Sequence, residues 1–206
     1  PTKISGIIRA IKGITSKPVT AKIRLGWNSN DSVAIAREIE RAGADAIMVH
    51  GRTASQGYSG TADWEAIRKV REAIDIPVVA NGDVNSGAKA AQMLHATGCE
   101  FGMVGRAAMT NPYIFREVRE WFEKGIGWKP TSEEKIGGFF DYMAACEEFD
   151  MVKLTDLRLK AVQFTKGIDF TKQVRVQLQN AQSAGQIRSL LKEFLEQAKQ
   201  RNLAYS

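Results

Sequence analysis

Short apolar runs alternate with longer amphipathic stretches through the first 124 residues of the chain. The apolar runs are rich in β-branched residues and are bounded by Gly, Pro or Asp, which predicts strands at 18–25, 45–50, 77–81 and 100–104. The stretches around them repeat apolar positions every three to four residues and predict helices at 3–14, 31–42, 62–73, 86–96 and 112–124. Strands that alternate with helices in this way indicate parallel βαβ units. Because the strands are almost wholly apolar, we expect them to be buried on both faces.

The strand pattern stops at Pro130, and from Thr131 onward the sequence predicts about four helices. We place the domain boundary within 125–130, which divides the chain into an α/β domain at 1–126 and a helical domain at 127–206.

Polar and glycine residues gather where the predicted strands end, and this distribution decides between an open sheet and a barrel. Lys22 lies within the first strand, and the other groups are His50-Gly51-Arg52, Asn81-Gly82-Asp83 and Gly105-Arg106. Barrels place active groups at the carboxyl ends of their strands and hold phosphate after strands seven and eight, where a short helix after Gly105 would help. No G-x-G-x-x-G follows any strand. We therefore predict an α/β fold: the second half of a (β/α)8 TIM barrel, with four βα units, followed by an all-α helical domain.

Charge and cysteine usage narrow the class of protein further. The formal net charge is +6, and residues 151–192 hold eight basic residues against Asp156 and Asp169. Such an excess is typical of a polyanion-binding surface, although a solvated helix face has the same composition. The two cysteines, Cys99 and Cys146, give neither a disulfide framework nor metal-ligand spacing, so we expect no metal and a cytoplasmic location. No apolar run is long enough to predict a membrane span, and no secretory leader is evident.

Four motifs resemble the tRNA-dihydrouridine synthase family, in the family's order and spacing over about residues 17–124. They are KPVTAKIRLGW (17–27), VHGRTASQGYSGTADW (49–64), IPVVANGDV (76–84) and GMVGRAAMTNPYIF (102–115). LRLKAVQFTKG (157–167) resembles the basic-aromatic helix of the family's RNA-binding domain more loosely. The resemblance implies FMN-dependent reduction of uridine to 5,6-dihydrouridine in tRNA, with NAD(P)H as the reductant.

The resemblance also implies flavin contacts, at Lys22, His50, Asn81, Gly82, Asp83, Gly105 and Arg106. Lys22 matches the lysine that stabilises the negative charge of reduced flavin, and a lysine in an apolar strand is costly to bury without such a partner. Gly105 and Arg106 match the phosphate loop. On the substrate side we expect Tyr58 and Arg52, which would support the site, meet the RNA backbone, or pair with Asp63 or Glu65. In the helical domain, Lys160, Lys166 and Arg175 are the expected contacts to tRNA phosphates.

The catalytic cysteine of the family lies upstream of its lysine strand, where this chain has only about seventeen residues. Neither cysteine of the chain is a suitable acid: Cys99 precedes a strand, and Cys146 adjoins Glu147 and Glu148, so we expect both to be buried structural residues. We therefore expect a fragment that is inactive alone and that pairs, through open sheet edges, with a missing N-terminal half of the barrel or with itself. Two alternatives stay open: another (β/α)8 enzyme, with FMN or with phosphate alone, and a non-catalytic RNA-binding module.

Overall fold

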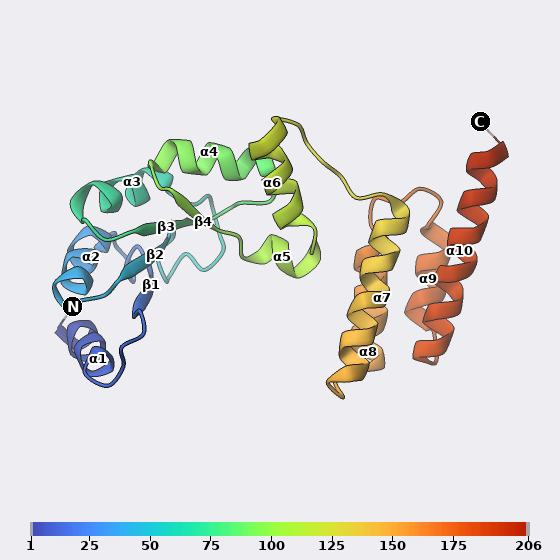
Figure 1. The fold of residues 1–206 in the computed structure, drawn as a ribbon, viewed down its shortest axis with the longest axis horizontal. Coiled ribbons are helices and arrows are strands. Elements are labelled where there is room, and N and C mark those ends of the chain that lie inside the picture. The colour runs from blue at the N-terminus through green and yellow to red at the C-terminus, as the bar shows by residue number, and fades with distance from the viewer. Residues whose placement is uncertain (1, 205–206) are drawn as a thin grey trace. The chain divides into compact units, whose positions relative to one another are not determined.

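The computed structural model describes residues 2–204, which form ten helices and four strands (Figure 1). They divide into two compact units. The first contains the residues up to Met109 together with Ile114–Trp128, and the second contains Thr110–Tyr113 and the chain from Lys129 onward. Each unit has its own hydrophobic core.

The α/β elements follow one another along the chain in the predicted alternation. Their bounds are α1 Thr2–Lys12, β1 Thr20–Arg24, α2 Ser32–Arg41, β2 Ala46–His50, α3 Trp64–Ala73, β3 Val78–Asn81, α4 Gly87–Thr97, β4 Phe101–Met103, α5 Arg106–Thr110 and α6 Ile114–Lys124. Every predicted strand and helix is confirmed, and each predicted end lies within two residues of the observed one.

Local sequence explains where α3 and α4 begin and end. The Asp63 carboxylate accepts a hydrogen bond from the Ala66 backbone N–H at 2.9 Å, and the Ser86 hydroxyl oxygen accepts one from Lys89 N–H at 3.2 Å. These side chains satisfy donors that a helix start leaves unpaired. Gly98 ends α4 with a φ of 65°, which glycine adopts at little cost. Both helices therefore start directly behind the loops that follow β2 and β3.

The four strands form one parallel sheet in the order β1-β2-β3-β4, with α1 to α4 along one side (Figure 1). The face toward the helices is fully buried at Ile47, Val49 and Ala80. On the other face Phe101 is 53% exposed, and Met48 and Val79 are only partly buried. The expectation that the strands are buried on both faces is thus wrong for the described residues, because only one layer of helices covers this sheet.

The second unit is helical and confirms the predicted change of pattern after Pro130. Its long helices are α7 Ser132–Glu148, α8 Leu154–Phe164, α9 Lys172–Asn180 and α10 Ala184–Ala204. The Thr131 hydroxyl and the Glu134 carboxylate cap the start of α7 reciprocally. Phe139, Leu178 and Leu191 are among the fully buried residues of its core. Within residues 2–204, no helix combines the length and apolar character that a membrane crossing requires.

Candidate functional site

Polar side chains form a row across the carboxyl edge of the sheet. Arg24, His50, Asn81 and Met103 are register partners on β1, β2, β3 and β4, so they share the face of the sheet that no helix covers. The Asn81 Nδ2 donates a hydrogen bond to the Met103 carbonyl oxygen at 2.8 Å, which ties β3 to the end of β4. Parallel α/β proteins bind their ligands at this edge, so the row marks the candidate site.

A second row lies one pleat further into the sheet, on the same face. Its register partners are Lys22, Met48, Val79 and Phe101. Lys22 is exposed in the row, and the other three side chains are apolar. The face thus presents an apolar floor with one cation at its end, below a polar rim.

His50 is the buried centre of the rim, with 7% of its surface exposed. Its Nε2 lies 3.4 Å from Nη1 of Arg52, a group that can only donate, so Nε2 accepts and the proton of the neutral ring sits on Nδ1. Burial lowers the pKa of His50 to about 4, and the positive charges of Arg24, Lys22 and Arg52 act in the same direction. At neutral pH His50 is therefore an uncharged hydrogen-bonding group and not a proton donor.

Arg52 is buried rather than presented to a ligand, with only 2% of its surface exposed. Its guanidinium donates to the carbonyl oxygens of Ser59 at 3.1 Å and Gly60 at 2.7 Å, and to the Asp83 carboxylate at 2.8 Å. Of the three expected alternatives, pairing with Asp63 or Glu65 is not observed, because the parallel strands bring Asp83, at the end of β3, to the Arg52 guanidinium. A contact between Arg52 and RNA does not fit this burial, whereas support of the site does.

Asp83 joins the loops that follow β2, β3 and β4. Its Oδ2 accepts hydrogen bonds from Arg52 and from the Ala62 N–H at 2.7 Å, and its Oδ1 accepts one from Nη2 of Arg106 at 3.0 Å. Burial would raise the pKa of Asp83, but the hydrogen bonds from Ala62 and Arg52 outweigh it, and the pKa is lowered. Asp83 is therefore a carboxylate at neutral pH.

Arg106 and Tyr58 are the accessible groups above this carboxylate. The Arg106 side chain is 48% exposed, and its guanidinium carbon lies 4.6 Å from the centre of the Tyr58 ring. Tyr58 is itself 63% exposed, and Arg24 lies 5.7 Å from its ring centre. Such cation–π contacts orient both cations while leaving their N–H groups available. The structure thus brings together Tyr58, Asp83 and Arg106, which lie far apart in the sequence.

The surroundings of Gly82 and Gly105, the two glycines predicted at the site, differ in whether they leave room for a side chain. A Cβ on Gly82 would lie 2.5 Å from the Cβ of Ala62, and its φ of 140° is one that L-residues rarely adopt. A Cβ on Gly105 would meet nothing within 4 Å. The local structure alone therefore explains why position 82 requires a glycine, whereas the space beside the Gly105 backbone is open.

Arg24 is a site residue that the sequence interpretation missed. Its Nη1 donates to the carbonyl oxygens of Thr53 at 2.9 Å and Gly57 at 2.8 Å, so it holds the 51–63 loop from the β1 side. Its position two residues after Lys22, on the same face of the same strand, was the available signal.

Neither cysteine belongs to the strand ends or loops that form this edge: Cys99 precedes β4, and Cys146 belongs to the second unit. Cys99 is buried immediately before β4, and burial raises the pKa of its thiol. Cys146 lies on α7 and is only partly buried, so the expectation that both cysteines are buried is wrong for Cys146.

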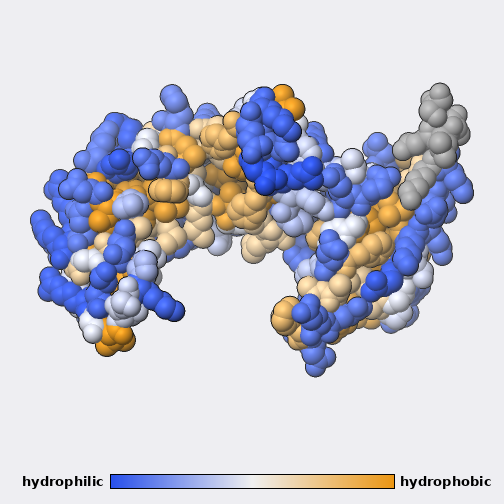
Figure 2. Space-filling view, in the orientation of Figure 1, coloured by the Kyte–Doolittle hydropathy of each residue, from blue (hydrophilic) through white to orange (hydrophobic). Residues whose placement is uncertain are grey.

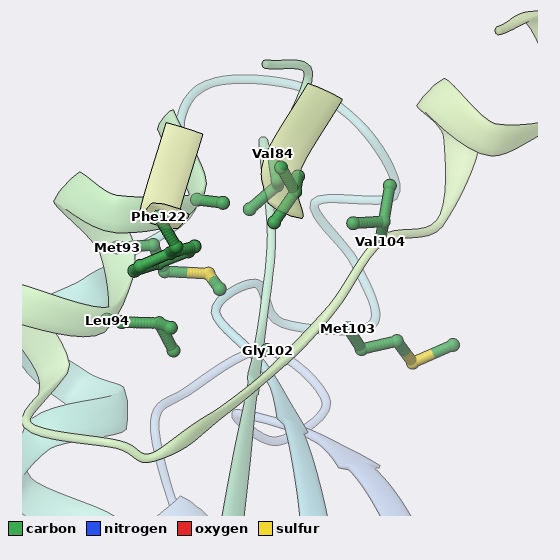
Figure 3. Close-up of a pocket in the computed structure, with 9 residues that line it drawn as sticks. Val84, Met93, Leu94, Gly102, Met103, Val104 and Phe122 are labelled. Carbon is green, nitrogen blue, oxygen red and sulfur yellow. The ribbon is translucent and has the colours of Figure 1, made fainter. Parts of the chain in front are cut away.

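An apolar pocket lies elsewhere in the first unit, where α4 and α6 meet β4 (Figure 3). Met93, Leu94 and Phe122 project into it from the helices, and Met103 points to the other side of β4 (Figure 3). Apolar surface is visible in the same part of the unit, between α4 and α6 (Figure 2). The cavity volume is about 70 Å³, far below the ~300–1,000 Å³ typical of cofactor sites. This pocket is a gap in packing and is separate from the polar edge.

Two arginines of the second unit have hydrogen-bond or ion-pair partners within that unit. Arg158 donates to the Ala181 carbonyl oxygen at 2.7 Å, and Arg188 pairs with Glu147 at 3.0 Å. Lys166 is exposed in the α8–α9 turn, Lys160 is partly buried on α8, and Arg175 is partly buried on α9. The three predicted tRNA contacts therefore come from consecutive segments of the chain.

A parallel α/β unit with a cationic rim at the carboxyl edge of its sheet has the architecture that phosphate- and nucleotide-binding α/β proteins share. Comparison with known proteins identifies the family. The dihydrouridine synthase (Dus) family model matches residues 1–204, and the chain belongs to this family.

Individual relatives match with substantial identity. A probable tRNA-dihydrouridine synthase of Aquifex aeolicus is 33% identical over 195 residues, covering 92% of this chain and 58% of the relative. The tRNA-dihydrouridine synthase B of Vibrio parahaemolyticus is 41% identical over 139 residues, 66% of this chain and 43% of the relative. That of Xanthomonas campestris is 43% identical over 131 residues, 63% of this chain and 38% of the relative. The chain thus spans about half the length of the curated relatives it matches.

Proposed function

We propose that the chain is the FMN-binding and tRNA-binding part of an NAD(P)H-dependent tRNA-dihydrouridine synthase. In this proposal residues 1–126 form the second half of a (β/α)8 barrel, and residues 127–206 form a helical tRNA-binding domain. The observation that carries it is the rim of Arg24, His50 and Asn81 beside the exposed Arg106, at the edge where barrels bind cofactors. Membership of the dihydrouridine synthase family favours this enzyme over other flavin barrels.

The side chains of the open face fit a flavin mononucleotide. Arg106 offers exposed N–H groups to the phosphate, and the open space beside Gly105 allows its backbone to approach. Lys22 would supply positive charge to the electron-rich side of the flavin ring, and the apolar floor, Asn81 and neutral His50 would hold that ring. When bound, the flavin supplies the hydride that reduces uracil in tRNA, after its own reduction by NAD(P)H.

The open sheet supports the proposal that more chain completes the barrel. In the described sheet β1 and β4 each pair with one neighbour only, and Phe101 is half exposed at the β4 edge. Unpaired strand edges and apolar faces favour pairing with further strands. We propose that an N-terminal half of the barrel covers this face, or a second copy in its absence. That half would carry the catalytic cysteine, so the chain alone is proposed to bind without turnover.

The cofactor assignment is tested by titrating this chain with FMN and following flavin fluorescence. We expect saturable quenching, and we expect Arg106→Ala to weaken binding at least tenfold, because a charge-assisted hydrogen bond contributes about 1.5–3 kcal/mol. Gly105→Ala should also weaken binding without changing stability, because its Cβ meets no protein atom.

The control for this titration is Arg68→Ala, which removes an exposed arginine that pairs with Glu65 and Glu72 on α3. Equal binding by wild type and Arg106→Ala would contradict the phosphate assignment. If the chain alone binds no FMN, repeating the titration with the N-terminal half present separates an incomplete site from a wrong cofactor.

The RNA assignment is tested by reversing three charges. We expect the triple variant Lys160→Glu, Lys166→Glu and Arg175→Glu to bind tRNA at least tenfold more weakly, because a cation that pairs with a phosphate releases counterions on binding and a glutamate does not. The slope of log affinity against log salt should fall by about one for each phosphate that is no longer neutralised. Fluorescence anisotropy with labelled tRNA between 50 and 200 mM salt, roughly the range over which such ion pairs respond, gives both values.

A matched control changes the net charge equally in the first unit, at three exposed cations: Arg9→Glu, Lys17→Glu and Lys69→Glu. If the control weakens binding as much as the test variant, the attraction comes from net charge and not from the helical unit.

A further inference from the structure

The buried Arg52 is the least expected feature of the site, because burying a guanidinium requires nearly complete hydrogen bonding. Besides the 3.4 Å contact between its Nη1 and Nε2 of His50, its bonds run in two directions. Nε and Nη2 donate to the carbonyl oxygens of Ser59 and Gly60, which follow Tyr58 in the loop. Nη2 also donates to Oδ2 of Asp83, at the end of β3. Arg52 thus connects the loop after β2 with the loop after β3.

Asp83 extends this connection to the surface. Its Oδ2 is held by Arg52 and by the Ala62 N–H, which leaves Oδ1 aimed at Arg106. Its backbone φ is 58°, a left-handed value that Asp and Asn adopt more readily than most other residues with a side chain. The carboxylate is therefore fixed from behind, and it presents one fixed oxygen to an exposed arginine.

The charges of the three groups support a further role. One carboxylate lies between two guanidiniums, so the Arg52–Asp83–Arg106 chain keeps one net positive charge. Without Arg52, Asp83 alone would neutralise Arg106 and would lower its attraction for an anion. Arg52 also holds the loop that places the Tyr58 ring 4.6 Å from the Arg106 guanidinium.

We propose that Arg52 is a positioning residue, which acts through Asp83 and the 51–63 loop to hold Arg106 oriented and charged for the phosphate of a flavin mononucleotide. This inference rests on the proposed function, in which Arg106 receives that phosphate. Arg52 itself touches neither cofactor nor RNA. Its hydrogen bonds of 2.7 to 3.1 Å all lead to the loops around Arg106, and only the longer contact of 3.4 Å leads to His50, so we expect its effect to fall mainly on the phosphate end of the ligand.

The first test compares FMN with riboflavin, which has the same ring and lacks the phosphate. Arg52→Lys keeps the charge but cannot make the forked set of hydrogen bonds. We expect it to weaken FMN binding at least tenfold and riboflavin binding less than twofold. The control, Arg68→Lys, changes an exposed arginine with two carboxylate partners on α3 and should alter neither affinity. Equal losses for both flavins, or no loss for FMN, would overturn the proposal.

A second measurement does not depend on flavin. The Nε–H group of Arg106 can be followed by NMR, and its heteronuclear NOE reports how firmly the side chain is held. We expect a high value in the wild type and a marked decrease in Arg52→Lys, whereas an unchanged value would overturn the proposal. If wild type binds neither flavin even with the N-terminal half added, the cofactor assignment fails, and this measurement still decides whether Arg52 positions Arg106.

Should Arg52→Lys fail to fold, Asp83→Asn takes its place in the NMR experiment. Asparagine has the same shape and tolerates the left-handed backbone, but an NH2 group replaces one of the two oxygens, so one of the two arginines meets a donor instead of an acceptor. We expect the Arg106 signal to become mobile in this variant as well. A signal that stays as ordered as in the wild type would show that the carboxylate does not hold Arg106.

Discussion

The Gly82→Ala substitution is expected to lower the free energy of unfolding of the first unit by about 2–5 kcal/mol. The new methyl group would lie 2.5 Å from the Cβ of Ala62, an atom that cannot move without its backbone. The φ of 140° adds strain for any residue with a side chain. Urea unfolding followed by tryptophan fluorescence measures the effect in this unit alone, because Trp27, Trp64, Trp121 and Trp128 all belong to it.

Two controls separate crowding from backbone strain. Gly98→Ala has a positive φ of 65° but no atom within 4 Å of its Cβ, so it should cost only about 1 kcal/mol. Adding Ala62→Gly to Gly82→Ala removes the collision and should restore part of the stability. A Gly82→Ala variant as stable as Gly98→Ala would contradict the close approach of the loops after β2 and β3.

The second large effect concerns the pH dependence of stability and its origin in His50. The pKa of His50 is lowered to about 4 in the folded chain, so between roughly pH 6.5 and pH 4 the unfolded state binds the proton and the folded state does not. The contribution of His50 to the free energy of unfolding is fully present above this pH range and is lost as the pH falls through it. At pH 4.5 the loss should be on the order of 2–3 kcal/mol.

The measurement is urea unfolding of wild type and His50→Gln at pH 7 and pH 4.5. Glutamine keeps an acceptor for Arg52 but does not titrate, so the variant should lose less stability on acidification than the wild type. The carboxylates of the chain titrate in both proteins, and the difference between the two therefore isolates His50. Parallel pH profiles would show that His50 is protonated at its ordinary pKa in the folded protein.

Much of the architecture could be predicted from the sequence because each element carries its own pattern. The apolar run at 45–50 and the amphipathic stretch at 86–96 need no distant information, and both were confirmed. The change to helices after Pro130 is equally local. What local pattern could not predict is which face of the sheet is covered, because β2, β3 and β4 carry apolar residues on both faces whether or not a second layer exists.

The site was predictable as a set of positions but not as a set of contacts. His50, Asn81 and Arg106 were expected at strand ends, and the parallel register places them along one edge. For Arg52 one of three expected alternatives was an ion pair with Asp63 or Glu65, whereas its carboxylate partner, Asp83, lies 31 residues away. Arg24 was missed because its bonds go to backbone carbonyls of a loop, which no motif records. The roles of these residues toward FMN and of Lys160, Lys166 and Arg175 toward tRNA stay predictions.

The order of strands in the sheet bears on how the first unit forms. Each strand pairs only with its neighbours in the chain, and register partners such as Thr20 and Ala46, Ile47 and Val78, or Val79 and Phe101 are 26, 31 and 22 residues apart. A ribosome adds this length in a few seconds, at roughly 5–20 residues per second. When each new strand emerges, its partner has therefore already left the ribosome. Every pairing closes a short loop, so its cost in chain entropy is modest. The sheet can grow strand by strand during translation, in the order in which the ribosome makes it.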